Sequence, residues 1–322
     1  MNKVKLCRVR KPGMFTTMQD AGRTGYLSQG LPPSGAMDHY AFTAANLLVG
    51  NHLKEAVLEM TLTGPELIFE ERAMLALTGG DFQPRLNGKQ VDMWTLFQVE
   101  AGDELTFRGP KSGARLYLAV AGGFHGDSFL NSQSTYVKAK AGGVNGRTLE
   151  EGDELYFHVP EWPDNKRARL HFELIPAYED EQTIRVVEGP EESAFTEEGL
   201  DHFYNSAYTI TNNADRMGYR LEGKKITHKN GADIHSDAIV FGTIQVAANG
   251  LPIILMADRQ TTGGYTRIAN VITVDLPKLA QMKPGQKVYF KKIEVKDAVE
   301  AMRAERKQFS NLAFAIHDMM SE

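Results

Sequence analysis

The stretch Gly102-Asp-Glu-Leu-Thr-Phe107 recurs as Gly152-Asp-Glu-Leu-Tyr-Phe157 and as Gly285-Gln-Lys-Val-Tyr-Phe290. In each copy a glycine precedes an alternating run that ends in phenylalanine. Glycine tolerates the backbone conformation that a tight turn requires, and alternation with a period of two predicts a strand with one buried face. The pattern therefore predicts glycine turns that lead into strands with the aromatic ring inward, and its recurrence in both halves suggests two related β-barrels.

Strand signals continue along the chain and predict a mainly β fold (α+β). Leu116, Leu118 and Val120 alternate with Arg115, Tyr117 and Ala119, and short apolar runs follow at 184–187, 238–241, 243–246, 252–255 and 268–274. Helices are few. We expect one capped by Asp38, one beginning at Thr196, a short one capped by Asp275 and a last one from about Asp297.

The length of 322 residues favours two domains. The region from Pro160 to about Gln182 holds prolines and an acidic run, and it breaks both periodicities. We therefore expect an N-terminal β-rich lobe at 1–165, a linker at 166–183, a β-barrel lobe at 184–295 and a C-terminal helix at 296–322.

Composition excludes several classes of protein. Acidic residues outnumber basic ones by 41 to 36, and no basic stripe interleaved with aromatics suggests nucleic-acid binding. The lone cysteine, Cys7, cannot form an internal disulfide, which favours a reducing compartment. Neither a signal peptide nor a membrane-spanning run is recognisable, so we expect a cytoplasmic protein.

Several cofactor motifs are missing from the sequence. It has no Gly-x-x-x-x-Gly-Lys-Ser/Thr loop and no Gly-x-Gly-x-x-Gly at a strand–helix junction. The histidines are scattered without metal-binding spacing, so no metal site is expected. Met282-Lys283 lacks the second methionine of a biotin-accepting lysine, so we expect no biotin on this chain.

Three polar, glycine-rich stretches are the candidates for chemistry. The first runs from Gln19-Asp-Ala-Gly-Arg23 through Ser34-Gly-Ala-Met-Asp38 into the predicted helix, where backbone N–H groups and Arg23 favour an anion. The second is Asp215-Arg-Met-Gly-Tyr-Arg-Leu-Glu-Gly223, a turn that presents two arginines. The third is Asp258-Arg-Gln-Thr-Thr-Gly-Gly-Tyr265, directly after an apolar strand. A structural Ω-loop and a solvated hairpin remain alternatives for the first two.

These stretches, in this order, resemble the allophanate hydrolase subunit 2 family, also called the biotin-dependent carboxyltransferase-like family. The resemblance extends from about Val9 to Phe290 and implies a two-lobed, cyclophilin-like β-barrel architecture. It further implies a hydrolase subunit of an ATP-dependent 5-oxoprolinase, which converts 5-oxoproline, ATP and water to L-glutamate, ADP and phosphate. The nucleotide would bind at the level of the complex, which also needs a B-type subunit of related fold and an A-type subunit.

From the resemblance and the residue types we expect the following roles. The predicted catalytic residues are Asp20, Arg23, Asp38, Asp258, Gln260 and Thr261. The predicted substrate-binding residues are Ser34, Gly35, Ala36, Met37, Arg216, Met217, Gly218, Arg259, Gly263, Gly264 and Tyr265. The three stretches would converge on one cleft that neutralises negative charge, and alanine at Arg23, Asp38 or Gln260 would remove activity with the fold intact.

Two other functions fit the same resemblance. A Kip antagonist is a binding module that sequesters a protein inhibitor of a sensor histidine kinase. A carboxyltransferase half of a biotin-dependent urea amidolyase or carboxylase would accept a carboxyl group from a biotin carried elsewhere. Both alternatives stay open at the level of sequence.

Overall fold

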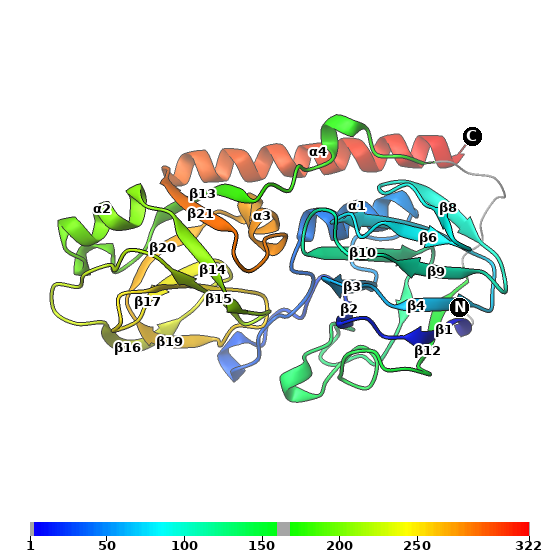
Figure 1. The fold of residues 1–322 in the computed structure, drawn as a ribbon, viewed down its shortest axis with the longest axis horizontal. Helices are drawn as coiled ribbons and strands as arrows, with labels where there is room; N and C mark the ends of the chain where they lie inside the picture. The colour runs from blue at the N-terminus through cyan, green and yellow to red at the C-terminus, as the bar shows by residue number, and fades with distance from the viewer. Residues whose placement is uncertain (1–2, 160–167, 322) are drawn as a thin grey trace. The chain divides into compact units, whose positions relative to one another are not determined.

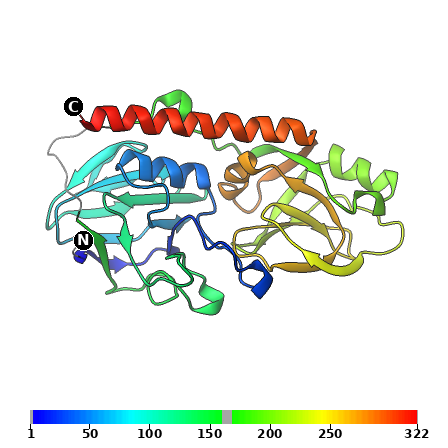
Figure 2. The same ribbon diagram turned by 180° about the vertical axis from the view of Figure 1, so that it is seen from behind.

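The computed structural model describes residues 3–159 and 168–321, with side chains as far as 315, and comprises two compact units (Figures 1 and 2). The first unit holds Met1–Arg23, Ser34–Tyr178 and Lys307–Glu322, and the second holds Thr24–Pro33 and Glu179–Arg306. The predicted boundary signals Pro160 and Pro163, and the first two residues of the predicted linker, lie outside the described residues. The predicted domain limits stay a prediction.

The first unit is a sandwich of two antiparallel β-sheets. One sheet has the strand order β11-β12-β1-β4-β9-β6-β7, and the other has the order β2-β3-β10-β5-β8. The strands are β1 (Lys3–Lys11), β2 (Phe15–Gln19), β3 (Val57–Thr61), β4 (Glu66–Phe69), β5 (Ala73–Gly79), β6 (Pro84–Leu86), β7 (Lys89–Gln90), β8 (Leu96–Val99), β9 (Glu104–Phe107), β10 (Arg115–Val120), β11 (Phe124–His125) and β12 (Glu154–His158).

The central strand β10 is buried on both faces. Leu116, Leu118 and Val120 belong to the core between the two sheets. Tyr117 and Ala119 belong to a second core on the opposite face, which helix α1 (His39–Leu48) covers (Figure 1). The alternation in the sequence therefore separates two cores rather than a core from solvent, because a helix covers the face that a sandwich usually leaves wet.

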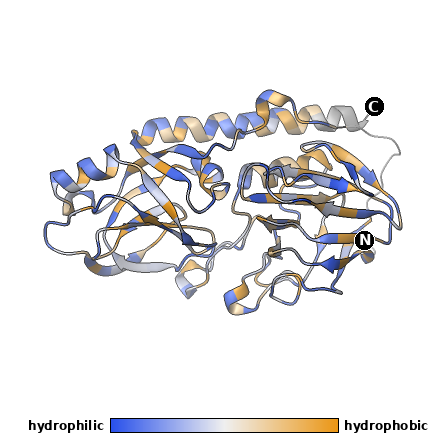
Figure 3. Cartoon of the chain, in the orientation of Figure 1, coloured by the Kyte–Doolittle hydropathy of each residue, from blue (hydrophilic) through white to orange (hydrophobic). Residues whose placement is uncertain are grey.

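Helix α4 (Val295–Ser321) contributes to the second core of the first unit. Phe309, Leu312 and Ala313 pack against it, and Gln308 donates a hydrogen bond to the hydroxyl of Tyr40 over 3.0 Å. Hydrophobic and hydrophilic positions alternate around the helix (Figure 3), as expected for a helix with one packed face. No helix in the described part of the chain is both long and apolar enough to cross a bilayer.

The second unit is a closed seven-stranded barrel with the order β13-β20-β17-β18-β15-β14-β21, and a separate two-stranded sheet pairs β16 with β19. Strands β13 and β21 are parallel, whereas the other barrel pairs are antiparallel. The elements are β13 (Glu181–Glu188), α2 (Glu197–Asn205), β14 (Tyr208–Ala214), β15 (Gly218–Glu222), β16 (Asp233–Ala238), β17 (Thr243–Val246), β18 (Pro252–Leu255), β19 (Thr262–Tyr265), β20 (Arg267–Val271), α3 (Leu276–Ala280) and β21 (Lys287–Lys292).

The recurring glycine pattern behaves largely as predicted. Gly102, Gly152 and Gly285 have φ angles of 91°, 88° and 88°, and each precedes a strand. Phe157 and Phe290 are buried. The mainly β fold with few helices is confirmed, but the suggestion of two barrels is wrong for the first unit, whose strands form two separate stacked sheets.

The expected helix starts are present, with one difference in capping. Asp38 and Thr196 accept hydrogen bonds from the N–H groups of Ala41 and Gly199, at 2.8 and 3.0 Å. Asp275 precedes α3 but makes no side-chain cap. Its carboxylate instead accepts three hydrogen bonds from Arg185, because a buried carboxylate gains more from a guanidinium than from one N–H group.

The barrel core predicts a measurable stability difference between neighbours on β21. Phe290 is buried and stacks on Phe203, with ring centroids 4.6 Å apart. We expect Phe290→Ala to lower the free energy of unfolding by about 3–5 kcal/mol through the cavity it leaves. Lys291→Ala, at an exposed position of the same strand, should change it by less than about 0.5 kcal/mol. Equal midpoints in urea would contradict the packing described for the barrel.

Candidate functional site

A hollow of about 570 Å³ opens on the outer face of the barrel in the second unit. Its apolar lining includes Ala214, Ile253 and Leu255. Its polar lining comes from Asn212, Asn213, Asp215, Arg220, Gln245, Gln260 and Tyr265. One oxygen of Asp215 is already engaged, because it accepts from the N–H groups of Met217 and Gly218. A concave surface where several polar groups meet apolar side chains can bind a small polar molecule.

A β-bulge brings two amide side chains to this hollow. Ile210 pairs with Leu221 and Ala214 pairs with Tyr219, so residues 211–213 of β14 lie opposite the single residue Arg220 of β15. The N–H group of Asn213 donates to the hydroxyl of Thr211 over 3.2 Å, which stabilises the bulge. Bulges of this kind re-aim side chains and are frequent beside active sites. Here the bulge sets Asn212 and Asn213 across from a cation.

Arg220 supplies the positive charge of the hollow. Its neighbours Tyr219 and Leu221 point into the barrel core, so the alternation of the strand turns Arg220 outward. Within residues 3–159 and 168–315 its side chain makes no hydrogen bond and no ion pair. A guanidinium carries five N–H donors in a planar fork that matches a carboxylate or phosphate. The hollow is therefore suited to an anionic ligand.

A buried ion pair joins the two loops that border the hollow. Arg216 donates to both oxygens of Asp258 from Nε and Nη2, at 2.8 and 3.1 Å, and both residues are less than a tenth exposed. The N–H group of Asp258 also donates to the carbonyl of Arg216 over 2.7 Å. The pair fixes the turn before β15 against the loop after β18, so the two predicted stretches do meet.

Other predicted residues of the third stretch lie around this pair. Arg259 is buried, donates to the carbonyls of Ile239 and Met256, and lies over the ring of Phe241. Burial lowers its pKa to about 10, although Asp258 acts in the opposite direction. Gln260 and Tyr265 are exposed at the hollow, and Thr261, next along the chain from Gln260, is half-buried.

Gly263 packs closely on the amide of Gln245. A Cβ at Gly263 would lie 2.6 Å from Nε2 of Gln245, so a larger residue would need the end of that side chain to shift. Gln245 is buried and donates to the carbonyl of Tyr265 over 3.2 Å. The small residues of this stretch thus allow strand β19 to approach the wall of the hollow.

In the first unit, Asp20 anchors a neighbouring loop. Its carboxylate accepts hydrogen bonds from the hydroxyls of Ser132 and Ser134, from the N–H group of Gln133 and from the N–H group of Gly22. These donors satisfy a buried charge by hydrogen bonding. In the structure Asp20 therefore stabilises the backbone and side chains around it. The catalytic role predicted for it stays a prediction.

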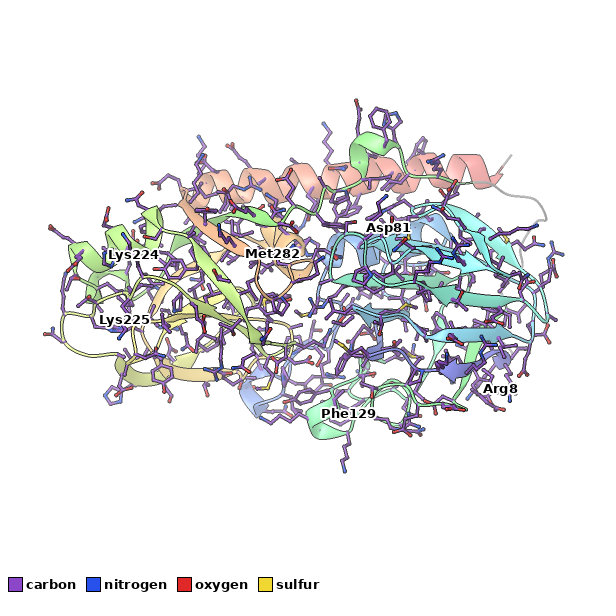
Figure 4. The ribbon with its side chains drawn as sticks, in the orientation of Figure 1. Arg8, Asp81, Phe129, Lys224, Lys225 and Met282 are labelled. Carbon is purple, nitrogen blue, oxygen red and sulfur yellow. The ribbon has the colours of Figure 1, made fainter. Side chains whose placement is uncertain are left out.

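Arg23 and Ser34 close the neck of the loop between them. Nη1 of Arg23 donates to the hydroxyl of Ser34 over 3.0 Å, and Nη2 donates to the carbonyl of Ser134. The guanidinium is 2% exposed and lies 5.5 Å from the ring centroid of Phe129, which Figure 4 labels. Gly35, with φ of 82°, packs on the backbone of Gly22. These contacts tie Arg23 to its own chain.

The stretch from Ala36 to Asp38 binds a buried carboxylate that sequence reasoning missed. Glu59, 1% exposed, accepts hydrogen bonds from the N–H group of Met37 and from the hydroxyl of Tyr117, each 2.8 Å long. The same hydroxyl accepts from the N–H group of Asp38, and Ala36 donates to the carbonyl of Asp20. Three N–H groups that an anion would need are therefore already engaged.

The predicted residues form two groups, one in each unit. Asp20, Arg23, Ser34, Gly35, Ala36, Met37 and Asp38 lie in the first unit, whereas Arg216, Met217, Gly218, Asp258, Arg259, Gln260, Thr261, Gly263, Gly264 and Tyr265 lie in the second. Convergence of all three stretches on one cleft stays a prediction. No three histidine, cysteine, aspartate or glutamate side chains gather into a metal-binding group among the described residues.

The hollow also contains polar residues that were not among the predicted site residues, namely Asn212, Asn213, Asp215, Arg220 and Gln245. The polar run Thr211-Asn-Asn213 interrupts the alternation of β14, and this interruption is a signal that reveals the bulge. Arg220 stood in the second stretch, but its residue type alone did not distinguish it from Arg216. Only the strand register shows which arginine is buried.

Comparison with known proteins gives one family. The model of the carboxyltransferase domain, subdomain A and B, matches residues 29–292. The chain is 36% identical over 315 residues to the C-type subunit of 5-oxoprolinase from Escherichia coli, covering 97% of this chain and 99% of that one. It is 37% identical over 290 residues to the protein of the same name from Haemophilus influenzae, covering 89% and 91%.

A solved structure agrees with these matches. The crystal structure of the Kluyveromyces lactis urea amidolyase superposes with a TM-score of 0.91 at 32% identity, covering 97% of this chain. This chain spans only 20% of that much longer protein. Nearly the whole length of the present chain therefore corresponds to one part of it.

The buried ion pair predicts non-additive stability effects. We expect Arg216→Met and Asp258→Leu each to lower the free energy of unfolding by about 3–5 kcal/mol, because each removes the opposite charge that a buried group contacts. The double variant should cost clearly less than the sum, since it leaves neither charge of the pair. Urea unfolding of the four proteins measures the coupling. Additive losses would mean that the two side chains do not depend on each other.

Proposed function

The chain belongs to the carboxyltransferase domain family, subdomains A and B, and from that premise we propose that it acts as one subunit of an ATP-dependent 5-oxoprolinase. The observation that carries the proposal is the hollow on the outer face of the barrel. There the guanidinium of Arg220, which has no internal partner among the described residues, stands among side-chain amides and apolar side chains. The relatives named as the C-type subunit of 5-oxoprolinase support the choice of substrate.

The chemistry of the hollow is complementary to 5-oxoproline. This substrate has a carboxylate, a lactam with one N–H donor and one C=O acceptor, and two ring methylenes. The guanidinium of Arg220 suits the carboxylate. The amides of Asn212 and Asn213 offer both a donor and an acceptor to the lactam. Ile253 and Leu255 offer apolar surface to the methylenes.

The reaction needs activation before hydrolysis, because a lactam is a poor electrophile. We infer that ATP phosphorylates the lactam oxygen and that water then attacks the ring carbon. Gln260 lines the hollow and Thr261 follows it, and they would orient the water or the developing oxyanion. Asp258 is held by Arg216, so we assign this pair the task of positioning the loop that carries Gln260.

The first unit would contribute through its shaped loop. Arg23 and Ser34 flank the segment 24–33 and are joined to each other by a hydrogen bond. We propose that this bond fixes the neck of the loop. Gly35 fits this task, because it packs on the backbone at the neck. The anion-binding role expected for the stretch from Ser34 to Asp38 remains a proposal that competes with this one.

The proposed enzyme is complete only with its partners. We propose that a B-type subunit of related fold and an A-type subunit share the reaction, and that ATP binds at the level of this complex. No biotin would be attached to the chain. We place the reaction in the cytoplasm, where a single buried thiol such as Cys7 needs no partner.

A second candidate function is a carboxyltransferase half that accepts a carboxyl group from biotin carried elsewhere. The likeness to the urea amidolyase favours it, and the same hollow would receive a carboxylate on Arg220. Incubation with a biotinylated carrier and bicarbonate tests this function. Transfer of labelled carboxylate, without glutamate formation from 5-oxoproline, would favour the carboxyltransferase over the oxoprolinase. The Kip antagonist remains a third candidate. It is a binding module, so either catalytic activity would show a function that the antagonist alone does not provide.

The cation of the hollow gives the direct test of the oxoprolinase proposal. In the complex reconstituted from the three subunits, Arg220→Gln should reduce glutamate formation from 5-oxoproline, mainly by raising KM about tenfold or more, because the carboxylate loses its partner. Lys224→Gln is the matched control, since this exposed lysine (Figure 4) follows the same strand outside the hollow. Wild-type KM in the Arg220 variant would contradict the assignment of the hollow.

A second test separates catalysis from structure. Gln260 is exposed, so Gln260→Ala should lower kcat about a hundredfold with no change in unfolding, if it orients water or the oxyanion. Asp38 is fully buried and caps α1, so Asp38→Ala should lower the free energy of unfolding by about 1–2 kcal/mol. This revises the expectation that alanine at Asp38 leaves the fold intact. Unchanged kcat for Gln260→Ala would remove it from the mechanism.

A further inference from the structure

A second, smaller hollow of about 170 Å³ lies beside the first one on the barrel. It shares Arg220, Asn213, Ala247 and Ile253 with the larger hollow, and it adds Glu222. We propose that this smaller hollow binds an α-amino acid in its zwitterionic form, with the carboxylate on Arg220 and the ammonium on Glu222. The identity of the amino acid as L-glutamate rests on the proposed function.

Strand geometry sets the two charges at a fixed separation. Arg220 and Glu222 are two residues apart on β15, and both are exposed, whereas Tyr219 and Leu221 are buried. Side chains at such positions leave the same face of a strand and start about 6.6–7 Å apart. The α-carboxylate and α-ammonium of an amino acid are attached to one carbon, so the ligand fits between two side chains at this spacing.

The two charges are not used by the protein itself. In the part of the chain that the structure describes, neither Arg220 nor Glu222 forms a side-chain hydrogen bond or an ion pair, and they are not paired with each other. Other polar groups in the smaller hollow are engaged in turns. Thr211 accepts from the N–H group of Asn213, and Asn249 accepts from the N–H group of Leu251. Arg220 and Glu222 therefore remain available for a ligand that carries both charges.

The proposed reaction produces such a ligand. Hydrolysis of the lactam adds one water, breaks the bond between the ring carbon and nitrogen, and leaves a new carboxylate and an amine. At neutral pH the amine takes up a proton and becomes an ammonium. This ammonium is the group that L-glutamate has and 5-oxoproline lacks. Because Arg220 lines both hollows, the α-carboxylate can stay on it while the new ammonium reaches Glu222.

Calorimetric titration of the full chain with three small ligands tests the inference. L-Glutamate carries the ammonium, 5-oxoproline carries the lactam in its place, and glutarate has two carboxylates without an amine. We expect Glu222→Gln to weaken L-glutamate about tenfold and to leave 5-oxoproline and glutarate unchanged, since one charge-assisted contact is lost. Arg220→Gln should weaken all three. Glu197→Gln, an exposed acid on α2 outside both hollows, is the matched control.

The outcomes separate this inference from the proposed function. No binding of L-glutamate to the wild-type chain, or equal binding to Glu222→Gln, overturns the amino-acid site. Equal loss of 5-oxoproline and L-glutamate in Glu222→Gln also overturns it, because the ammonium would then not be recognised. Turnover of 5-oxoproline by the complex is measured independently. Turnover without amino-acid binding sinks only this inference, and amino-acid binding without turnover sinks only the oxoprolinase.

Discussion

Two opposite charges buried against each other, Arg216 and Asp258, are the constraint on which the candidate site depends. Each charge alone would cost several kcal/mol in a dry environment, so each requires the other to stay in place. Their bidentate contact joins the turn before β15 to the loop after β18. Met217 and Gln260, one from each of these segments, both line the larger hollow. The ion pair therefore links two segments of its wall.

In the barrel, the inward and outward residues of one strand have different roles. On β15 the inward residues Tyr219 and Leu221 stabilise the core, and the outward residues Arg220 and Glu222 present opposite charges to solvent. Because the inward residues hold the strand backbone in place, the backbone positions of the outward side chains are also fixed. The bulge in β14 then adds amides opposite Arg220 without disturbing the pairing on either side. The residues that stabilise the barrel and the residues that present polar groups to the hollow thus lie on the same two strands.

Much of the fold could be predicted from the sequence because its signals are local. The glycine turns at Gly102, Gly152 and Gly285 and the helix cap at Asp38 each depend on a few neighbouring residues. The site was predicted less completely because burial depends on distant partners. Glu59 reads as the polar member of an alternating strand, yet it is buried beneath Met37 and Tyr117. Arg216 and Arg220 have the same residue type, and only the barrel separates the structural arginine from the accessible one.

The hollow of this chain is compatible with the substrates of both proposed enzymes. An accessible arginine, side-chain amides and apolar side chains are complementary to an anionic group next to an amide, and that description fits a lactam acid. It equally fits a carboxyl group carried on a ureido ring. The Arg216–Asp258 pair and the Gly263–Gln245 contact form the framework beside the hollow. In each pair the two residues contact each other within the chain. In this chain the outward residues of β14 and β15 are distinct from that framework, so a substitution at Asn212, Asn213 or Arg220 leaves the Arg216–Asp258 pair in place.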